Sequence, residues 1–420
     1  MRHRAGGFPG TLLLPGLCAR AALRTVLAGL VAAACILFSP GPALAASDAD
    51  FDGDGRVDQS DYAALTAAFG SRLSRFDLNG NGVVDFHDVV LFAREYVGHT
   101  QPSRDPEAIP IDVDGASGRV ETFVLPTAGS YPYDIAADGQ GIVWFTEMGT
   151  NSIGRFDPRT GAFLEYPLSA PAAQPFRLAI DSKGRIWFTE IAANRIGCLN
   201  PVSEEIQEFV VPTAGSRPHG LVFDRKGILW FTQESGNHIG RFDPVRLTFS
   251  EFELPTADVG LDGIVVDEHG AVWFAERNTG RLGRLDPVTR QIVEYSLLGD
   301  EVRLRHIALD SGGRVWITGN GSGRLGVFDP NTGNTTWFAP PRDVPQPVAI
   351  AVDSEDRVWF AGSSVNRVVR FDWEAWHYRI YKSGSPESRI GNLTVDRSFH
   401  RVWFTNPAQN RIGRIGESGP

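Results

Sequence analysis

Short apolar segments separated by turns rich in Gly, Asp and Pro recur from residue 119 to the end of the chain. Each repeat holds a tryptophan at an equivalent position, and these equivalent tryptophans are 43 residues apart, except for a last interval of 44. They are Trp144, Trp187, Trp230, Trp273, Trp316, Trp359 and Trp403. Every repeat begins with an apolar strand ending in Asp and continues with Trp-Phe-Thr-Glu and Asn-x-Ile-Gly-Arg-Phe-Asp-Pro or variants, and every repeat but the last ends with an outer strand. Four short strands in about 40 residues are typical of one propeller blade.

The repeats therefore predict a mainly β fold, a seven-bladed β-propeller of four-stranded blades over residues 118–420. The last repeat ends at 414–420 without an outer strand, whereas residues 119–126 resemble an outer strand without the rest of its blade. We expect this N-terminal strand to complete the seventh blade, because such closure removes an exposed sheet edge. The 10 Trp and 26 Phe against two Met agree with this fold, since flat rings pack well between sheets.

A different polar pattern precedes the propeller. Residues 50–61 place Asp at loop positions 1, 3, 5, 9 and 12, with Gly55 at position 6, where the chain turns sharply. The pattern recurs 27 residues later, and apolar residues at helical spacing follow each loop, over 62–69 and 89–96. Oxygen donors at this spacing predict two bound calcium ions. The predicted ligands, with position 7 acting through its main-chain carbonyl, are Asp50, Asp52, Asp54, Arg56, Asp58 and Asp61, then Asp77, Asn79, Asn81, Val83, Asp85 and Asp88.

These two loops end in Asp rather than Glu, and no helix is evident before the first of them. In both respects residues 46–98 resemble the dockerin module, a small α-helical domain with two EF-hand-like loops. The resemblance implies structural calcium and a cohesin-type partner on a scaffold or cell surface. The alternative interpretation, an acidic linker rich in turns, would not repeat the loop spacing twice. Residues 99–117, with Pro102, Pro106 and Pro110, are predicted to be a linker.

The first 45 residues have the features of a signal peptide. Four arginines precede an apolar run over 26–38, and Ala43-Leu44-Ala45 has the small-x-small pattern of a cleavage site. The mature chain is predicted to begin at Ala46 and to be secreted, extracellular or periplasmic. A lipid anchor at Cys35 is the alternative, but Ala32 occupies the position where a lipoprotein signal has Leu, so we favour release. No other apolar stretch is long enough to span a membrane.

The net charge and the cysteine content bear on nucleic-acid binding and on disulfide bonds. Removal of the four N-terminal arginines changes the formal net charge from -10 to -14, which makes nucleic acid a poor partner. Cys18 and Cys35 leave with the signal peptide, so Cys198 remains alone and no intrachain disulfide is expected. We expect a monomer.

Function is best sought where equivalent positions of the repeats differ, because one ligand cannot obey sevenfold symmetry. The repeated glycines, such as Gly154, and turns such as Asp157-Pro158 are predicted to be structural. A hairpin centred near Lys226 is expected to place His219 opposite Glu234 at one mouth of the central channel.

Three sets of equivalent positions are predicted to surround this mouth. The first set is Tyr133, Phe176, His219, Asp262, Arg305, Val348 and Gly391. The second is Asp134, Arg177, Gly220, Gly263, His306, Ala349 and Asn392. The third, expected to face them after each Trp, is Glu147, Glu190, Gln233, Glu276, Gly319, Gly362 and Asn406. Ionisable groups concentrate in blades one to five.

These positions nominate His219 as a base and Glu234, with Asp262, as a metal ligand or charge partner. The predicted substrate-binding residues are Tyr133, Phe176, Arg177, Asp262, Arg305 and His306. For Glu147, Glu190 and Glu276 we favour the structural alternative, in which each carboxylate only accepts backbone hydrogen bonds in the following turn.

The motifs Arg217-Pro-His-Gly-Leu221 and Trp230-Phe-Thr-Gln-Glu-Ser-Gly-Asn-His-Ile-Gly-Arg241 resemble the virginiamycin B lyase (streptogramin lyase) family, and the resemblance covers residues 119–416. It implies a seven-bladed propeller and a magnesium-dependent elimination that opens a cyclic depsipeptide antibiotic. His219 matches the family's base and Glu234 its metal-binding Glu. Arg217 stands where the family has a second metal-binding Glu, and Phe176 where it has a substrate-contacting His. An arginine beside the metal position would repel a cation.

Three functions remain open from the sequence. The first is a secreted lyase-like enzyme acting on an extracellular ester or sugar derivative. The second is a non-catalytic propeller that binds a ligand or protein at its mouth and is fixed to a scaffold by its dockerin-like module. The third is an architectural surface protein, whose channel residues could be replaced without effect.

Overall fold

The computed structural model describes residues 118–297, 303–362, 364–383, 389–396 and 399–417, a strand at 111–113, and residues 51, 64–65, 68, 74–76, 78 and 83–84. The chain divides into two compact units, residues 1–104 and residues 105–420. Each unit is described by itself.

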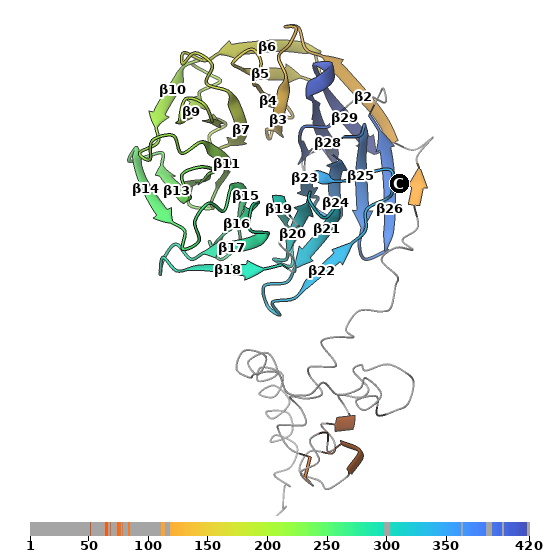
Figure 1. Cartoon of the computed structure of the whole chain (residues 1–420). Helices are drawn as coiled ribbons and strands as arrows, with labels where there is room; N and C mark the ends of the chain where they lie inside the picture. The colour runs from red at the N-terminus through yellow and green to blue at the C-terminus, as the bar shows by residue number, and fades with distance from the viewer. Residues whose placement is uncertain are drawn as a thin grey trace, which may run out of the picture. The chain divides into compact units, whose positions relative to one another are not determined.

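Within its described residues, the second unit consists of seven β-sheets placed around a central channel (Figure 1). Blade one contains β3 (Pro132–Ala137), β4 (Val143–Glu147), β5 (Ser152–Asp157) and β6 (Ala162–Pro167). Blade two contains β7 (Pro175–Ile180), β8 (Ile186–Glu190), β9 (Arg195–Leu199) and β10 (Ile206–Val210). Blade three contains β11 (Pro218–Phe223), β12 (Leu229–Gln233), β13 (His238–Asp243) and β14 (Thr248–Glu253). Blade four contains β15 (Leu261–Val266), β16 (Val272–Glu276), β17 (Arg281–Leu285) and β18 (Ile292–Ser296).

The remaining blades follow the same order from the channel outward. Blade five contains β19 (Leu304–Leu309), β20 (Val315–Gly319), β21 (Arg324–Phe328) and β22 (Thr335–Phe338). Blade six contains β23 (Pro347–Val352), β24 (Val358–Gly362), β25 (Arg367–Asp372) and β26 (His377–Lys382). Blade seven contains β27 (Leu393–Asp396), β28 (Arg401–Asn406), β29 (Arg411–Glu417) and β2 (Gly118–Val124). The predicted seven-bladed propeller of four-stranded blades is confirmed.

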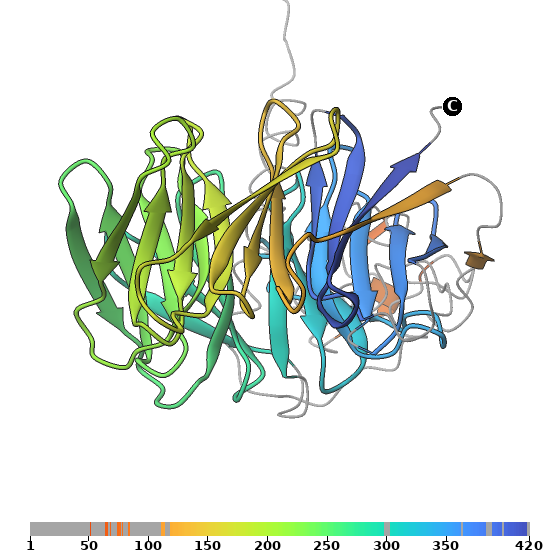
Figure 2. The same ribbon diagram turned by 90° about the horizontal axis from the view of Figure 1, so that it is seen from above.

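Blade seven is built from both ends of the propeller. β2 pairs antiparallel with β29, from Gly118 opposite Glu417 to Val124 opposite Arg411. Figure 2 shows the two strands side by side at the rim. The predicted closure by the N-terminal strand is therefore confirmed, and it covers the edge that β29 would otherwise expose.

The segment before β2 also contains a strand that the sequence analysis missed. β1 (Ile111–Val113) pairs in parallel with β26, from Ile111 opposite Tyr378 to Val113 opposite Ile380, and adds a fifth strand to blade six. The prediction of a linker over 99–117 is thus wrong for these three residues. A strand this short carries no periodicity from which it could have been recognised.

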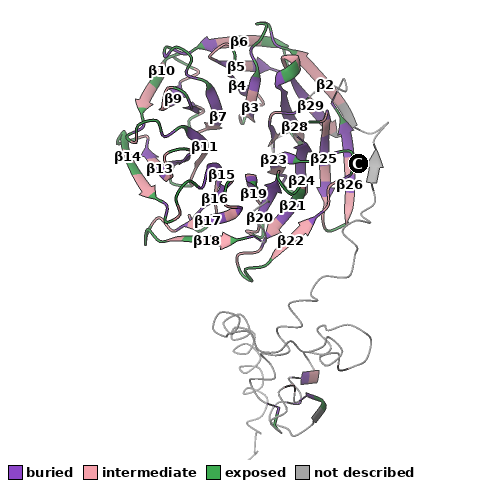
Figure 3. Ribbon diagram, viewed as in Figure 1, coloured by how far each residue is buried: buried purple, intermediate pink, exposed green. Residues whose placement is uncertain are grey.

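The repeated tryptophans pack between blades, as predicted. Trp144, for example, lies in one buried cluster with Ile186 and Phe188 of blade two. Figure 3 shows the same burial along the inner and middle strands of every blade. In blades one to six the indole N–H also donates to the Asp six residues earlier, as in Trp230 to Asp224 at 3.1 Å. Blade seven has one extra residue at this point, and no described residue accepts from Trp403 Nε1.

The repeated glycines have a specific packing reason. A Cβ on Gly240 would lie 2.1 Å from the ring of Phe231, and one on Gly283 would lie 1.9 Å from Phe274. The phenylalanine of each Trp-Phe motif therefore covers the glycine of the adjacent strand. In blade six the pair is Phe360 and Val369 instead.

The first unit is described only in part. Leu65, Phe76 and Val84 are buried, and Phe51 contacts Phe76 with ring centroids 4.7 Å apart. Ala64, Leu65 and Ala68 are helical and Ser74–Phe76 form a 3-10 turn, η1, but no complete α-helix is defined among the described residues, so the predicted α-helical module is not supported by them. The signal peptide, Cys35 and the calcium ligands other than Val83 lie outside the described residues. No helix in the described part is long and apolar enough to cross a membrane.

Candidate functional site

The inner strands surround a cavity of about 500 Å³. Its wall is largely apolar, with Leu178, Val222 and Ile264 among the lining residues. Polar groups come from the beginnings of the inner strands, where Asp134, Arg177, His306 and Asn392 line the cavity. The predicted second set of mouth positions therefore lines the cavity except for Ala349, whereas no residue of the first set, which includes His219, Asp262 and Arg305, lines it.

A β-bulge at the start of each inner strand in blades one to six determines which residues reach the mouth. In blade three, Pro218 pairs with Gln233 and Leu221 with Phe231, so His219 and Gly220 together oppose Thr232. The Thr232 hydroxyl accepts from Gly220 N at 2.8 Å and donates to the carbonyl of Asp262 in blade four at 2.8 Å. The threonine of the Trp-Phe-Thr motif thus fills the bulge and joins neighbouring blades.

The bulge also corrects the predicted register. Glu234 N donates to Arg217 O at 3.1 Å, so Arg217, rather than His219, lies opposite Glu234. The sequence alone does not show the extra residue of a bulge, which shifts every position beyond it.

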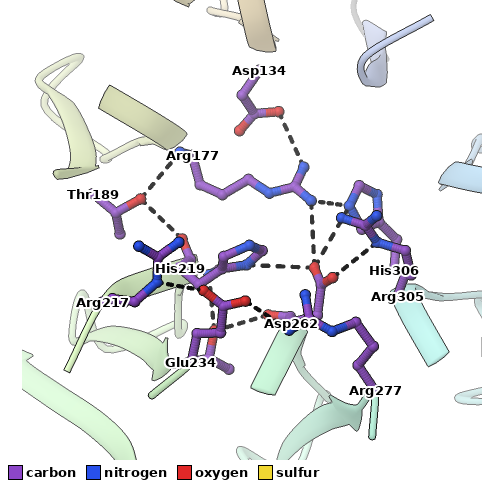
Figure 4. Close-up of polar contacts among 12 residues, drawn as sticks. Asp134, Arg177, Thr189, Arg217, His219, Glu234, Asp262, Arg277, Arg305 and His306 are labelled. Carbon is purple, nitrogen blue, oxygen red and sulfur yellow. Dashed lines mark hydrogen bonds and ion pairs between the residues drawn. The ribbon is translucent and has the colours of Figure 1, made fainter. Parts of the chain in front are cut away.

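Asp262 is the centre of the first charged cluster (Figure 4). It is fully buried and accepts a hydrogen bond from Arg305 Nε on Oδ2 at 3.0 Å. Its Oδ1 lies 3.4 Å from His219 Nδ1, 3.7 Å from Arg177 Nη2 and 3.8 Å from His306 Nε2. Blades two, three and five therefore each bring one or two groups to this carboxylate of blade four.

Arg177 connects this cluster to the opposite side of the mouth. Its Nη2 donates to His306 Nε2, and its Nη1 lies 3.6 Å from Asp134 Oδ1. Asp134 also accepts from Asn392 Nδ2 of blade seven and from Leu178 N at 2.8 Å. The side chain of Arg177 thus crosses the mouth between blades one and five.

His219 is only 3% exposed and lies against an aromatic pair. Its ring centroid is 4.3 Å from that of Phe176, which stacks on Tyr133 at 4.1 Å. Burial lowers the pKa of His219 to about 4, although Asp262 acts in the opposite direction. The imidazole is therefore neutral at physiological pH. A carboxylate facing Nδ1 favours the tautomer with a proton on Nδ1, which leaves Nε2 with a free electron pair.

The neighbouring groups Asp262 and His306 are both deprotonated but differ in charge. Burial alone would raise the pKa of Asp262, but His219, Arg305 and Arg177 together hold it below its usual range. Burial, and then the charge of Arg177, hold the pKa of His306 well below its usual range. Asp262 is therefore charged and His306 neutral.

Glu234 forms a second cluster with two arginines. Arg217 Nε donates to its Oε2 at 2.8 Å, and Arg277 Nη2 donates to its Oε1 at 2.7 Å. These bonds outweigh the effect of burial and hold the pKa of Glu234 below its usual range. Arg277 was not among the predicted site residues, although it occupies the position equivalent to Glu234 one blade later.

The residues around Glu234 do not fit a magnesium ion. Both carboxylate oxygens are already hydrogen-bonded to guanidinium groups, which carry the same sign of charge as the metal. Among the described residues, no group of three or more His, Cys, Asp or Glu side chains is arranged to hold a metal.

The third predicted set of mouth positions, like the first, does not line the cavity. Glu147, Glu190 and Glu276 are fully buried and are absent from the cavity lining. Thr150 donates to Glu147 at 2.9 Å and Thr279 to Glu276 at 2.6 Å, so the donors are threonine hydroxyls of the following turn rather than the backbone groups that the structural alternative predicted. Burial raises the pKa of each of the three carboxyl groups to about 7.

Comparison with known proteins gives a consistent result for the propeller. The model of the virginiamycin B lyase family matches residues 111–237 and 221–420. No curated protein matches the chain.

Solved structures agree with the family match. Virginiamycin B lyase from Staphylococcus aureus, as selenomethionine protein, is 26% identical with a TM-score of 0.66, and the match covers 71% of this chain and 99% of that one. A streptogramin B lyase is 27% identical with a TM-score of 0.67, covering 72% of this chain and 98% of its own. A catalytically inactive variant of the Staphylococcus aureus enzyme, solved with quinupristin, is 25% identical with a TM-score of 0.66, covering 71% and 99%.

Proposed function

The chain belongs to the virginiamycin B lyase family, and from this premise we propose that its propeller eliminates a carbon–oxygen bond in an extracellular ester or sugar derivative, with His219 as general base. The observation that carries the proposal is the contact of 3.4 Å between His219 Nδ1 and the buried carboxylate of Asp262. Neither Nδ1 nor the facing Oδ1 has a hydrogen-bond partner among the described residues, so the contact is electrostatic, and at this distance the carboxylate stabilises the imidazolium that forms when Nε2 takes a proton.

The proposed step needs no oxidant or reductant. His219 Nε2 takes a proton from a carbon adjacent to a carbonyl group. The electron pair of that C–H bond forms a carbon–carbon double bond, and the carbon–oxygen bond on the next carbon breaks. The leaving carboxylate keeps the bonding pair, and the imidazolium then releases its proton to solvent.

Positive charge at the mouth supports this chemistry. Arg305 and Arg177 lie beside Asp262, and Arg217 and Arg277 lie on Glu234. Fixed guanidinium groups stabilise negative charge that develops on a carbonyl oxygen or leaving group. We derive no step through magnesium, because the residues around Glu234 do not fit it.

The test is turnover of a panel of esters by the His219→Gln variant, measured as the absorbance of the new double bond. Loss of the base is expected to lower kcat by about 10²-fold to 10⁴-fold. The matched control is Arg246→Gln, which removes a 78% exposed arginine from a surface turn and leaves turnover unchanged.

The pH profile supplies a second readout. Because the pKa of His219 is about 4, kcat/KM of the wild-type protein is expected to fall only below about pH 4. Equal turnover in both variants, or an acidic limb near the ordinary histidine pKa, would rule out this role.

A second candidate function is a non-catalytic propeller that binds its ligand at the same mouth. The burial of His219 behind Phe176, and Arg217 beside Glu234, favour it. Ligand binding that is unchanged in His219→Gln, without product in either protein, would select this function over the lyase.

We further propose that the chain is a secreted monomer and that residues 46–98 bind two calcium ions and a cohesin-type scaffold. The support is the repeated loop pattern in the sequence. The full-length chain should lose two calcium ions, measured by metal analysis, when Asp50 and Asp77 are both replaced by Ala. Unchanged calcium content would refute the two loops as calcium sites.

A further inference from the structure

We propose that Arg217, Arg277 and Arg305 form a binding site for a carboxylate group of the ligand. The site lies at the position that the resemblance to the lyase family assigns to a metal ion. This inference deepens the proposed function and rests on it for the location of the substrate, because it names the chemical class bound beside His219.

Glu234 holds two of these arginines next to each other. Each of its oxygens accepts one guanidinium N–H, from Arg217 at 2.8 Å and from Arg277 at 2.7 Å. A guanidinium has five N–H groups, and no described residue accepts from the remaining ones of these two side chains. Glu234 therefore positions two guanidinium groups whose remaining N–H donors are available to a ligand.

The arginines are accessible from the mouth, whereas the carboxylates are not. The side chains of Arg217, Arg277 and Arg305 are 48%, 30% and 26% exposed, against 13% for Glu234 and 0% for Asp262. A ligand that approaches from solvent therefore meets guanidinium groups before it meets the acids that hold them.

Charge selects an anion with one negative charge. Among the described residues of the two clusters, Arg177, Arg217, Arg277 and Arg305 face Asp134, Glu234 and Asp262, and His219 and His306 are neutral. The mouth thus has one uncompensated positive charge in a chain with a net charge of -10. A monocarboxylate neutralises it, whereas a doubly charged phosphate would leave an excess of negative charge, and a divalent cation would add to the repulsion.

An aromatic pair lies beside His219, and the guanidinium of Arg177 lies over both of its rings. Tyr133 stacks on Phe176, and Phe176 contacts His219. Planar guanidinium groups bind carboxylates through paired hydrogen bonds, and flat rings favour a flat or apolar body. The site therefore fits a carboxylate attached to a ring.

Benzoate and its neutral counterpart benzamide are the probes. Both are titrated by calorimetry into the full chain carrying His219→Gln, so that turnover does not contribute. We expect benzoate to bind at least about tenfold more tightly than benzamide, and Arg217→Gln or Arg277→Gln to remove about tenfold in benzoate affinity without changing that of benzamide.

Two further variants keep the result interpretable. Arg246→Gln removes a surface arginine that already pairs with Asp243, and it should leave both affinities unchanged. Arg277→Lys retains the charge but loses the paired donors, and it should give an intermediate affinity even if Arg217→Gln fails to fold.

The inference is overturned if benzoate and benzamide bind equally, or if Arg246→Gln weakens benzoate as much as Arg217→Gln does. Its failure is distinguishable from that of the proposed function. If neutral esters are turned over but benzoate binds no more tightly than benzamide, the lyase function is supported and the carboxylate site is refuted. If benzoate binds through the arginines but no ester is turned over, the carboxylate site is supported and the lyase function is refuted.

Discussion

Two groups of buried acids in the propeller differ in their partners, although both come from the repeated strands. Asp262 and Glu234 at the mouth are held by arginines, and their pKa values lie below the usual range. Glu147, Glu190 and Glu276, inside blades one, two and four, have pKa values of about 7 because burial dominates. The comparison shows that burial alone does not decide the charge of a carboxyl group, since the cation that another blade supplies decides it.

The largest effect is expected for Asp262→Asn. This change leaves Arg305 and Arg177 beside a neutral amide in a fully buried position, so the free energy of unfolding should fall by about 3–5 kcal/mol. Urea denaturation of the wild-type and Asp262→Asn proteins measures the difference. A loss below about 1 kcal/mol would show that the arginines do not depend on this carboxylate.

Glu190→Gln should have the opposite effect. Neither oxygen of Glu190 has a hydrogen-bond partner among the described residues, and its pKa is about 7. Its folded-state pKa is raised, so stability falls as pH rises from the unfolded value near 4.5 through 7. The variant should gain about 1–3 kcal/mol at pH 8 and little at pH 4. Denaturation at both pH values is the measurement, and an equal change at both would contradict the account.

Gln233→Glu is the reverse test. Blade three already has an amide at the position of Glu190, and Gln233 donates to Glu251 at 2.7 Å. An acid there would replace that hydrogen bond with a pair of carboxyl groups. The variant should lose about 1–3 kcal/mol at pH 8 and less at pH 4, in the same denaturation assay. A loss that does not depend on pH would indicate packing rather than charge.

The smallest effect on stability is expected for Glu234→Gln. Its partners Arg217 and Arg277 are partly exposed, so solvent replaces much of the interaction and the unfolding free energy should fall by about 1 kcal/mol or less. A loss of unfolding free energy as large as that of Asp262→Asn would contradict this expectation. It would show that the Glu234 cluster stabilises the fold as much as the buried Asp262 cluster does.

The repeat pattern was sufficient to predict most of the propeller. The tryptophan interval predicts the blades, and the incomplete first and last repeats predict the pairing of β2 with β29, because strand periodicity and sheet closure are local rules. The short strand β1 escaped prediction, since Ile111–Val113 has no pattern of its own.

The candidate site was predictable only in part. His219, Asp262, Arg177, Arg305 and His306 were found because they break the repeat, and the structure brings them together. The facing of His219 and Glu234 was wrong, because the bulge adds a residue to one strand. The opposite charges at the equivalent positions of Glu234 and Arg277 were a signal that could have identified Arg277.

The sequence by itself determined the number of blades, the closure and the side chains that depart from the repeat, because these follow from spacing along the chain. Only the tertiary structure decided which carboxyl groups are charged and which face the channel. Bulges set the direction of each side chain. The partners of Asp262 come from blades two, three and five, and Glu234 pairs with Arg217 of its own blade and with Arg277 of blade four, so the packing of blades decides these contacts.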